Sequence, residues 1–181
     1  MHVVRLVFAV GWAAFWLYWL LAAFSMKRGH VQWSRELRVR AVIAILAFIL
    51  VRVGAFRGHA ANSDLRAAIG LVLFVFGLAF AIWARVHIGR NWGTPMTRKD
   101  EPELVTSGPY HRVRHPIYLG IVVAGIGTCV ALSWLWLPAV FLAGVYFVYS
   151  ATMEERYLTG QFPDIYPAYK RTTKMLVPFV F

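Results

Sequence analysis

Long runs of apolar residues without a charge constrain this chain more than any other feature. A helix needs about 20 such residues to cross the hydrocarbon core of a bilayer, and residues 6–26 form one run of that length. Residues 67–84 form a second run at the short end of the range. The chain is 60% hydrophobic, which exceeds the share of about half that is usual in soluble domains. We therefore predict an integral membrane protein.

A further candidate span lies between these two runs, at residues 39–56. It is apolar from residue 41 to residue 51 but contains Arg52. Because an arginine inside the bilayer is costly, this segment spans only if the side chain of Arg52 snorkels to the interface.

Residues 116–153 are uncharged over a length that is too great for one helix. The sequence Ser-Trp-Leu-Trp-Leu-Pro at 133–138 interrupts the stretch near its middle. We expect two antiparallel helices joined by a tight turn, with Trp134 and Trp136 in the interfacial aromatic belt. The predicted fold is an all-α integral membrane protein with about five transmembrane helices, and residues 1–181 form a single domain.

The basic residues indicate the orientation of these five spans. Cytoplasmic loops of membrane proteins carry an excess of Lys and Arg. Four of the 19 basic residues, Arg5, Arg52, Arg57 and Arg66, fall on one predicted face, and the rest fall on the other. The rich face is thus predicted to be cytoplasmic. We expect a bacterial-type inner or plasma membrane, with the active site facing the cytoplasm and the N-terminus outside. The net charge of +11 indicates anionic lipid headgroups as partners rather than nucleic acid, since the basic residues flank the spans.

A polar segment at residues 104–120 interrupts the apolar pattern on the cytoplasmic side. Gly108-Pro109 predicts a turn, and Pro116 suits the first turn of a helix, where its missing N–H costs nothing. Arg114, His115 and Tyr118 are then presented around a helix N-terminus, which favours an anionic ligand. The alternative is that these side chains only meet lipid headgroups and the interface.

Glu154 and Glu155 end the apolar hairpin that follows this segment. Acidic residues oppose the dipole at the C-terminal end of a helix, so two adjacent ones suggest a function. The hairpin brings Glu154 and Tyr118 to the same depth, because both lie about one helix length from the turn. We predict that the cytoplasmic loop and the C-terminal tail form a cofactor pocket there. His111 and His115 have the spacing of a metal pair, but the intervening turn signals lead us to predict no metal site.

These residues resemble the isoprenylcysteine carboxyl methyltransferase family and its relatives among the membrane phospholipid methyltransferases. The resemblance covers about the C-terminal half of the chain. The matching pattern comprises Leu-Val-Thr-Ser-Gly-Pro-Tyr at 104–110, Arg-His-Pro-Ile-Tyr-Leu-Gly at 114–120, Glu154, Glu155, Leu158, Phe162, Tyr166, Tyr169 and Pro178. The helices within residues 1–84 match only as generic apolar helices, so residues 85–181 are expected to be the cofactor-binding half.

The resemblance implies an S-adenosylmethionine-dependent methyltransferase that acts on a lipophilic small molecule or a lipid at the membrane. It implies cofactor contacts from Glu103, Leu104, Val105, Tyr110, His115, Pro116, Ile117, Tyr118 and Glu154. We assign the catalytic roles to Arg114, His115, Glu154 and Glu155, with the last three as the candidates for a general base. The reaction would be a direct in-line methyl transfer, for which the protein aligns the reactants and excludes water.

Two positions depart from the family's pattern. Glu103 stands where many members have a histidine, and Ser150 stands where members that methylate prenylcysteine carboxylates have an arginine. Two other interpretations of the function stay open: a membrane reductase that uses a nicotinamide cofactor, and a non-enzymatic scaffold or transporter. A transporter would place charged or broken segments at mid-membrane, whereas this chain concentrates its polar groups at one face.

Overall fold

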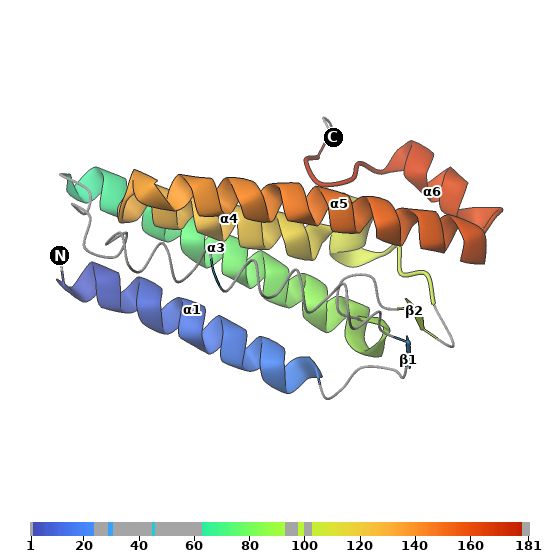
Figure 1. The fold of residues 1–181 in the computed structure, drawn as a ribbon, viewed down its shortest axis with the longest axis horizontal. Helices are drawn as coiled ribbons and strands as arrows, with labels where there is room; N and C mark the ends of the chain where they lie inside the picture. Colours follow the sequence, from blue (N-terminus) through green and yellow to red (C-terminus); the bar gives the residue numbers. More distant parts are fainter. Residues whose placement is uncertain are drawn as a thin grey trace.

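The computed structural model describes residues 2–23, 29–30, 45, 63–92, 98–99 and 103–178. Apart from Ile45, the predicted span at 39–56 lies outside the described residues. Four long helices account for most of the described chain and lie along one another (Figure 1). In chain order the elements are α1 (His2–Ala23), β1 (Gly29–His30), α3 (Asp64–Ile88), η1 (Gly89–Asn91), β2 (Arg98–Lys99), η2 (Gly108–His111), α4 (Pro116–Ala131), η3 (Trp134–Trp136), α5 (Leu137–Gln161) and α6 (Ile165–Thr172).

The predicted apolar helices are confirmed where the structure describes them. Residues 6–23 of the first run belong to α1, residues 24–26 lie outside the described residues, and the run at 67–84 is the middle of α3. Among the described residues, three helical segments are long and apolar enough to cross a membrane, namely His2–Ala22, Asp64–Asn91 and Trp134–Gln161. The helix α4 is apolar but shorter, at 16 residues. The fold is therefore the predicted helical membrane type, while the number of spans and their orientation stay predictions.

The uncharged stretch at 116–153 forms a helical hairpin, as predicted. Its first helix, α4, begins with Pro116 in the first turn. At the bend the Ser133 side chain accepts a hydrogen bond of 3.3 Å from the backbone N–H of Leu135, which caps the short helix η3. Trp134 is exposed at this bend. Polar capping and an exposed indole are typical of a turn at a membrane–water interface, and the position of this turn relative to the membrane stays a prediction.

Small residues bring α3 and α4 into close backbone contact. A Cβ added to Gly77 would lie 2.4 Å from the backbone nitrogen of Ala124, and one added to Gly127 would lie 2.6 Å from the carbonyl oxygen of Gly70. Small residues at a helix interface let two backbones approach, which favours packing where the hydrophobic effect is weak. We call this contact the glycine seam; it comprises Gly70, Gly77, Ala81, Gly120, Ala124, Gly127 and Ala131.

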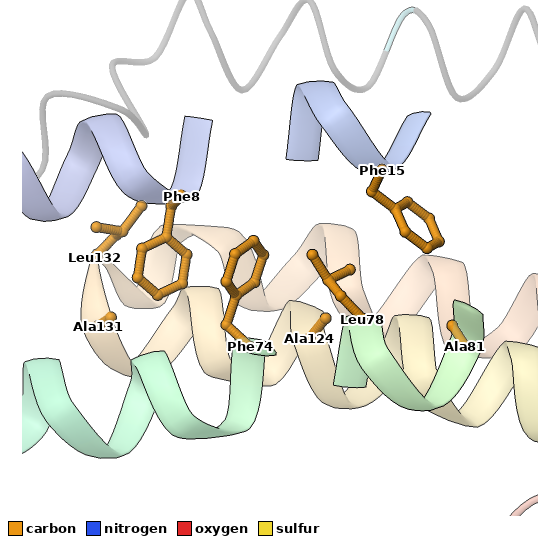
Figure 2. Close-up of a cluster of buried hydrophobic side chains, with 8 residues drawn as sticks. All are labelled: Phe8, Phe15, Phe74, Leu78, Ala81, Ala124, Ala131 and Leu132. Carbon is orange, nitrogen blue, oxygen red and sulfur yellow. The ribbon is translucent and has the colours of Figure 1, made fainter. Parts of the chain in front are cut away.

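The helix α1 packs on the same two helices through large aromatic side chains (Figure 2). The rings of Phe8 and Phe74 have centroids 4.4 Å apart, and the indole N–H of Trp12 donates a hydrogen bond of 3.1 Å to the Thr128 hydroxyl. Outside this core, large apolar side chains such as Phe76 and Phe141 are exposed. Exposed apolar surface on long helices suits contact with lipid.

The polar segments gather at the end of the bundle that lies opposite the N-terminus (Figure 1). The helix α6 lies at this end, as does the short antiparallel pair in which Gly29 faces Lys99 and His30 faces Arg98. The helix α5 continues to Gln161, so Glu154 and Glu155 do not end it as predicted. They lie two turns before its end. The last turns of α5 extend beyond α4, and α5 packs against α6 (Figure 1).

Candidate functional site

A cleft opens at the polar end between the segment before α4, the end of α3, and α5 with α6. Its lining mixes aromatic, apolar and charged side chains, which is typical of small-molecule sites. The lining residues are Ile88, Asn91, Trp92, Glu103, Leu104, Val105, Tyr110, Arg114, His115, Pro116, Ile117, Tyr118, Glu154, Leu158, Tyr166 and Tyr169.

The first wall of the cleft is fixed to the end of α3. Gly108 has a φ of +59°, and a Cβ there would lie 2.6 Å from the His87 ring, so this turn requires glycine. The next residue but one, Tyr110, is buried and its hydroxyl donates a hydrogen bond of 3.4 Å to the carbonyl of Ala84. The predicted turn at Gly108-Pro109 is present as the start of η2.

The C-terminal tail holds the other side of this segment. The backbone N–H of Arg114 donates to the carbonyl of Lys174 at 2.8 Å, and that of His115 donates to the carbonyl of Met175 at 3.0 Å. The Tyr169 hydroxyl donates to the carbonyl of Tyr110. These bonds join residues about 60 positions apart, so the loop before α4 keeps its shape only while the tail is in place.

Glu154 and Tyr118 meet inside the cleft. The Tyr118 hydroxyl donates a hydrogen bond of 3.1 Å to Oε2 of Glu154 and lies 3.3 Å from the hydroxyl oxygen of Ser150. The His115 and Tyr118 rings are stacked with centroids 5.4 Å apart, and His115 Nδ1 lies 3.8 Å from Glu154 Oε2. The prediction that Tyr118 and Glu154 share one depth is confirmed.

Glu155 is not among the residues that line the cleft, and its carboxylate joins three segments of the chain. Its Oε1 accepts a hydrogen bond of 2.7 Å from Nε of Arg114 and lies 3.4 Å from Nε2 of His115. Its Oε2 lies 2.8 Å from Nζ of Lys170. The Glu155 side chain is only 3% exposed, so its charge is balanced by these partners rather than by water. We call Arg114, Glu155 and Lys170 the ionic cluster.

Burial leaves the tyrosines of the loop and tail as neutral hydrogen-bond donors. Desolvation raises the pKa of Tyr110, Tyr166 and Tyr169 well above the usual value for a phenol. A phenol that stays protonated at neutral pH donates a hydrogen bond and does not act as a base. Proton acceptance in the cleft is thus left to the carboxylate and imidazole groups.

The structure brings together nearly every residue predicted for the site. All nine residues predicted for the cofactor line the cleft, and so do Arg114, His115 and Glu154 from the catalytic set. Glu155 does not line it, because its carboxylate is turned toward α6 by Lys170 and Arg114. Their roles stay predictions.

Six lining residues were not predicted as site residues. Leu158, Tyr166 and Tyr169 belong to the matching family pattern, so that pattern carried a signal for them. Ile88 ends α3, Asn91 ends η1, and Trp92 follows η1 directly. Nothing in their local sequence distinguishes them from a polar helix end. His111 is exposed in η2 whereas His115 is buried, and no group of three potential metal ligands occurs in the ranges that the structure describes.

Comparison with known proteins gives the same family as the sequence pattern. A sequence profile described as the Isoprenylcysteine carboxyl methyltransferase (ICMT) family matches residues 68–159. The match begins in α3 and ends in α5 beyond the glutamate pair. It therefore contains the glycine seam and much of the cleft.

Curated relatives include enzymes with different acceptors in their names. The chain is 30% identical over 115 residues to protein-S-isoprenylcysteine O-methyltransferase B of Arabidopsis thaliana, a match that covers 61% of this chain and 58% of that protein. It is 34% identical over 87 residues to methanethiol S-methyltransferase 1 of Bradyrhizobium diazoefficiens, which covers 43% and 27% respectively. The chain thus spans little more than half the length of the first relative.

A solved structure of the eukaryotic intramembrane Ras methyltransferase ICMT has a similar fold. The TM-score is 0.59 at 27% sequence identity, and the alignment covers 83% of this chain and 55% of that one. This similarity and the apolar helices together identify an integral membrane protein.

Proposed function

The chain belongs to the isoprenylcysteine carboxyl methyltransferase family, and from this membership we propose that it transfers a methyl group from S-adenosylmethionine to a lipophilic acceptor. The observation that carries the proposal is the meeting of His115, Tyr118 and Glu154 in one cleft at the polar end of the bundle. All the lining residues fall within 85–181, the half proposed to bind the cofactor.

The residues of the cleft fit the chemical groups of S-adenosylmethionine. Trp92, Ile117 and Leu158 offer apolar and aromatic surface to an adenine ring. The α4 N-terminus, with His115 at its cap, suits the donor's carboxylate. Glu154 offers an acceptor to the ribose hydroxyls or the amine. We propose these contacts together with those of Glu103, Leu104, Val105, Tyr110, Pro116 and Tyr118.

S-adenosylmethionine would supply a sulfonium-bound methyl group that is open to in-line attack. The protein's part is then to align the acceptor with that methyl group and to exclude water. The Tyr118 ring stacks between the rings of His115 and Phe147, with centroids 5.4 and 4.6 Å away, which restricts the orientation of its hydroxyl. The ionic cluster keeps Arg114 and the loop before α4 in register with α5. Arg114 and Glu155 are thus positioning residues in this proposal.

The acceptor is proposed to be lipophilic because the cleft adjoins apolar helix faces. Phe147 lies behind Tyr118, and the exposed side chains of Val145 and Phe141 follow on the same helix toward the bend. An acceptor with an apolar tail would approach along α5 from the bilayer, and the soluble cofactor would arrive from water. With the cleft on the basic face, we propose that this water is the cytoplasm and that the N-terminus is outside.

Calorimetry on the full chain in detergent tests the proposal. S-adenosylhomocysteine, the demethylated product, should bind saturably with a stoichiometry near one per chain. NADPH, the ligand expected of a membrane reductase, should give no saturable heat. Saturable binding of NADPH alone, or of neither compound, would refute a methyltransferase.

A further inference from the structure

Arg85 is a buried arginine near the end of α3, and its side chain contacts three other parts of the chain. It is only 3% exposed. Nη1 donates a hydrogen bond of 2.8 Å to the carbonyl of Gly89, and Nη2 donates one of 2.8 Å to the carbonyl of Ala22 in the last turn of α1. The guanidinium carbon lies 4.5 Å from the ring centroid of Trp92. An ionisable side chain that is withheld from water on a membrane helix is a candidate for a functional role.

The first of these contacts supports the turn that follows α3. Gly89 has a φ of +56°, a left-handed conformation that favours glycine. Its carbonyl accepts from the Arg85 side chain and also from the backbone N–H of Trp92, at 3.2 Å. The short helix η1 ends there, and Trp92 lines the cleft. The side chain of Arg85 and the backbone of Trp92 thus share one acceptor, so Arg85 supports the turn that presents Trp92.

The other two contacts act on the indole of Trp92 and on α1. The guanidinium lies over the Trp92 ring, within the range of a cation–π interaction. The Trp19 ring of α1 meets the same indole edge to face, with centroids 5.5 Å apart. Because Ala22 lies about one helical turn beyond Trp19, the hydrogen bond from Arg85 holds the part of α1 that packs on this ring. Trp92 is therefore held through its backbone, its ring and the helix behind it.

We infer that Arg85 is a positioning residue of the cofactor site, which holds the indole of Trp92 in the cleft wall so that the donor's adenine packs on it. The inference rests on the proposed methyltransferase function, in which Trp92 offers aromatic surface to that ring. Arg85 itself does not line the cleft, so its effect on the cofactor passes through Trp92. A displaced indole would leave the adenine less contact, and the donor would bind more weakly. The end of α1 then contributes to cofactor binding through the same arginine.

Arg66, near the start of α3, provides a matched control. It donates a hydrogen bond of 3.2 Å to the carbonyl of Val130 at the end of α4, and its guanidinium carbon lies 5.7 Å from the ring centroid of Trp134. Both arginines thus contact a carbonyl at the end of a neighbouring helix and a tryptophan ring. Neither Arg66 nor Trp134 lines the cleft, so loss of Arg66 should affect stability alone.

Calorimetric titration with S-adenosylhomocysteine separates positioning from folding, because the stoichiometry reports the folded fraction of the sample and the dissociation constant reports the site. In the full chain in detergent, Arg85→Met should raise the dissociation constant about tenfold, with a stoichiometry still near one. Arg66→Met should leave the dissociation constant unchanged. Arg85→Lys keeps the charge but cannot donate from two nitrogens of a rigid planar group, so it should raise the constant about threefold.

A double-mutant cycle tests whether Arg85 acts through Trp92. Trp92→Leu removes the indole and should by itself raise the dissociation constant about tenfold. In this background Arg85→Met should raise it no further, because the ring that Arg85 positions is gone. A purely structural role of Arg85 would not depend on the indole in this way.

An unchanged dissociation constant in Arg85→Met or in Trp92→Leu, or an Arg85 effect that persists without the indole, overturns the inference. It is also overturned if Arg66→Met weakens binding as much as Arg85→Met. Should Arg85→Met not fold, Arg85→Lys decides by the same criterion, and failure of both to fold assigns Arg85 to folding and overturns the inference. In each of these cases saturable binding by the unaltered protein leaves the proposed function standing, whereas its absence refutes both.

Discussion

The glycine seam and the cleft beside Glu154 are held together by different chemistry. At the seam, backbone atoms of α3 and α4 lie so close that a Cβ at Gly77 would come within 2.4 Å of a neighbouring nitrogen. In and beside the cleft, the contacts are hydrogen bonds and ion pairs between side chains from three separate segments, and the ion pairs belong to Glu155, which does not line the cleft. The seam therefore excludes any added atom, whereas the cleft leaves polar groups accessible to a ligand. Mutations should separate the two: changes in the seam should affect folding, and changes to Tyr118 and Glu154 inside the cleft should affect binding.

Breaking the ionic cluster should cause the largest loss of stability. It tests whether a part of the polar end is needed for folding, as the seam is. Glu155→Ala leaves Arg114 and Lys170 without their buried carboxylate. Removing one partner of a buried pair costs about 3 kcal/mol, so the thermal unfolding temperature in detergent should fall clearly. The neighbouring Glu154→Ala is the matched control, because its carboxylate is 36% exposed and its loss should cost below about 1 kcal/mol. Equal losses in the two variants would contradict the separate roles of the two glutamates.

A methyl group in the seam should give the next largest effect. Gly77→Ala places a Cβ against the backbone of α4, and overpacking of this kind costs about 2 kcal/mol. Gly144→Ala is the control, because a Cβ at that position of α5 would have no atom within 4 Å among the described residues outside its own stretch of helix. It should be neutral or slightly stabilising, since alanine favours a helix more than glycine does. Thermal unfolding of both variants measures the difference. Similar unfolding temperatures would contradict the tight backbone packing at the seam.

Removing one hydroxyl from the cleft should leave folding almost intact. Tyr118→Phe keeps the ring stacked on Phe147 but loses the hydrogen bond to Glu154. A single hydrogen bond of this kind contributes about 1 kcal/mol. We expect methyl transfer to slow by about fivefold to tenfold while the unfolding temperature changes little. A variant that unfolds as readily as Gly77→Ala would show that the Tyr118 hydroxyl is structural.

The exposed end of the ionic cluster should give the smallest effect. The Lys170 side chain is 42% exposed, so solvent and salt screen its attraction to Glu155. Lys170→Met should cost below about 1 kcal/mol, and the cost should shrink further at high salt. Comparing unfolding temperatures at low and high salt measures this, and a loss as large as that of Glu155→Ala would place Lys170 at the centre of the cluster.

Much of the helical part of the fold follows from the sequence. Apolar runs and the break at 133–138 predicted α1, α3 and the hairpin of α4 and α5, because membrane thickness and turn residues determine those lengths. The approach of Tyr118 to Glu154 followed from equal distances to the turn. These features depend on local pattern and simple helix geometry.

The different environments of Glu154 and Glu155 could not be predicted in the same way. Successive residues on a helix point about 100° apart, so the function of each depends on which element covers its face. That element is the tail, and Arg114 meets Lys170 and Thr173 across more than 50 residues of sequence. No local pattern encodes such a contact. Asn91 and Trp92 were missed for a related reason, since a short helix after α3 turns them into the cleft.

Photolabelling with methyl-labelled S-adenosylmethionine tests the central claim most directly, namely that the loop before α4 and the end of α5 build one cofactor site. Ultraviolet irradiation of the bound cofactor attaches label to neighbouring residues, and peptide mapping by mass spectrometry locates it. The account predicts label on peptides from residues 103–118 and from residues 154–169, in both cases abolished by excess S-adenosylhomocysteine. Label confined to other parts of the chain, or label that the excess product does not displace, would contradict it.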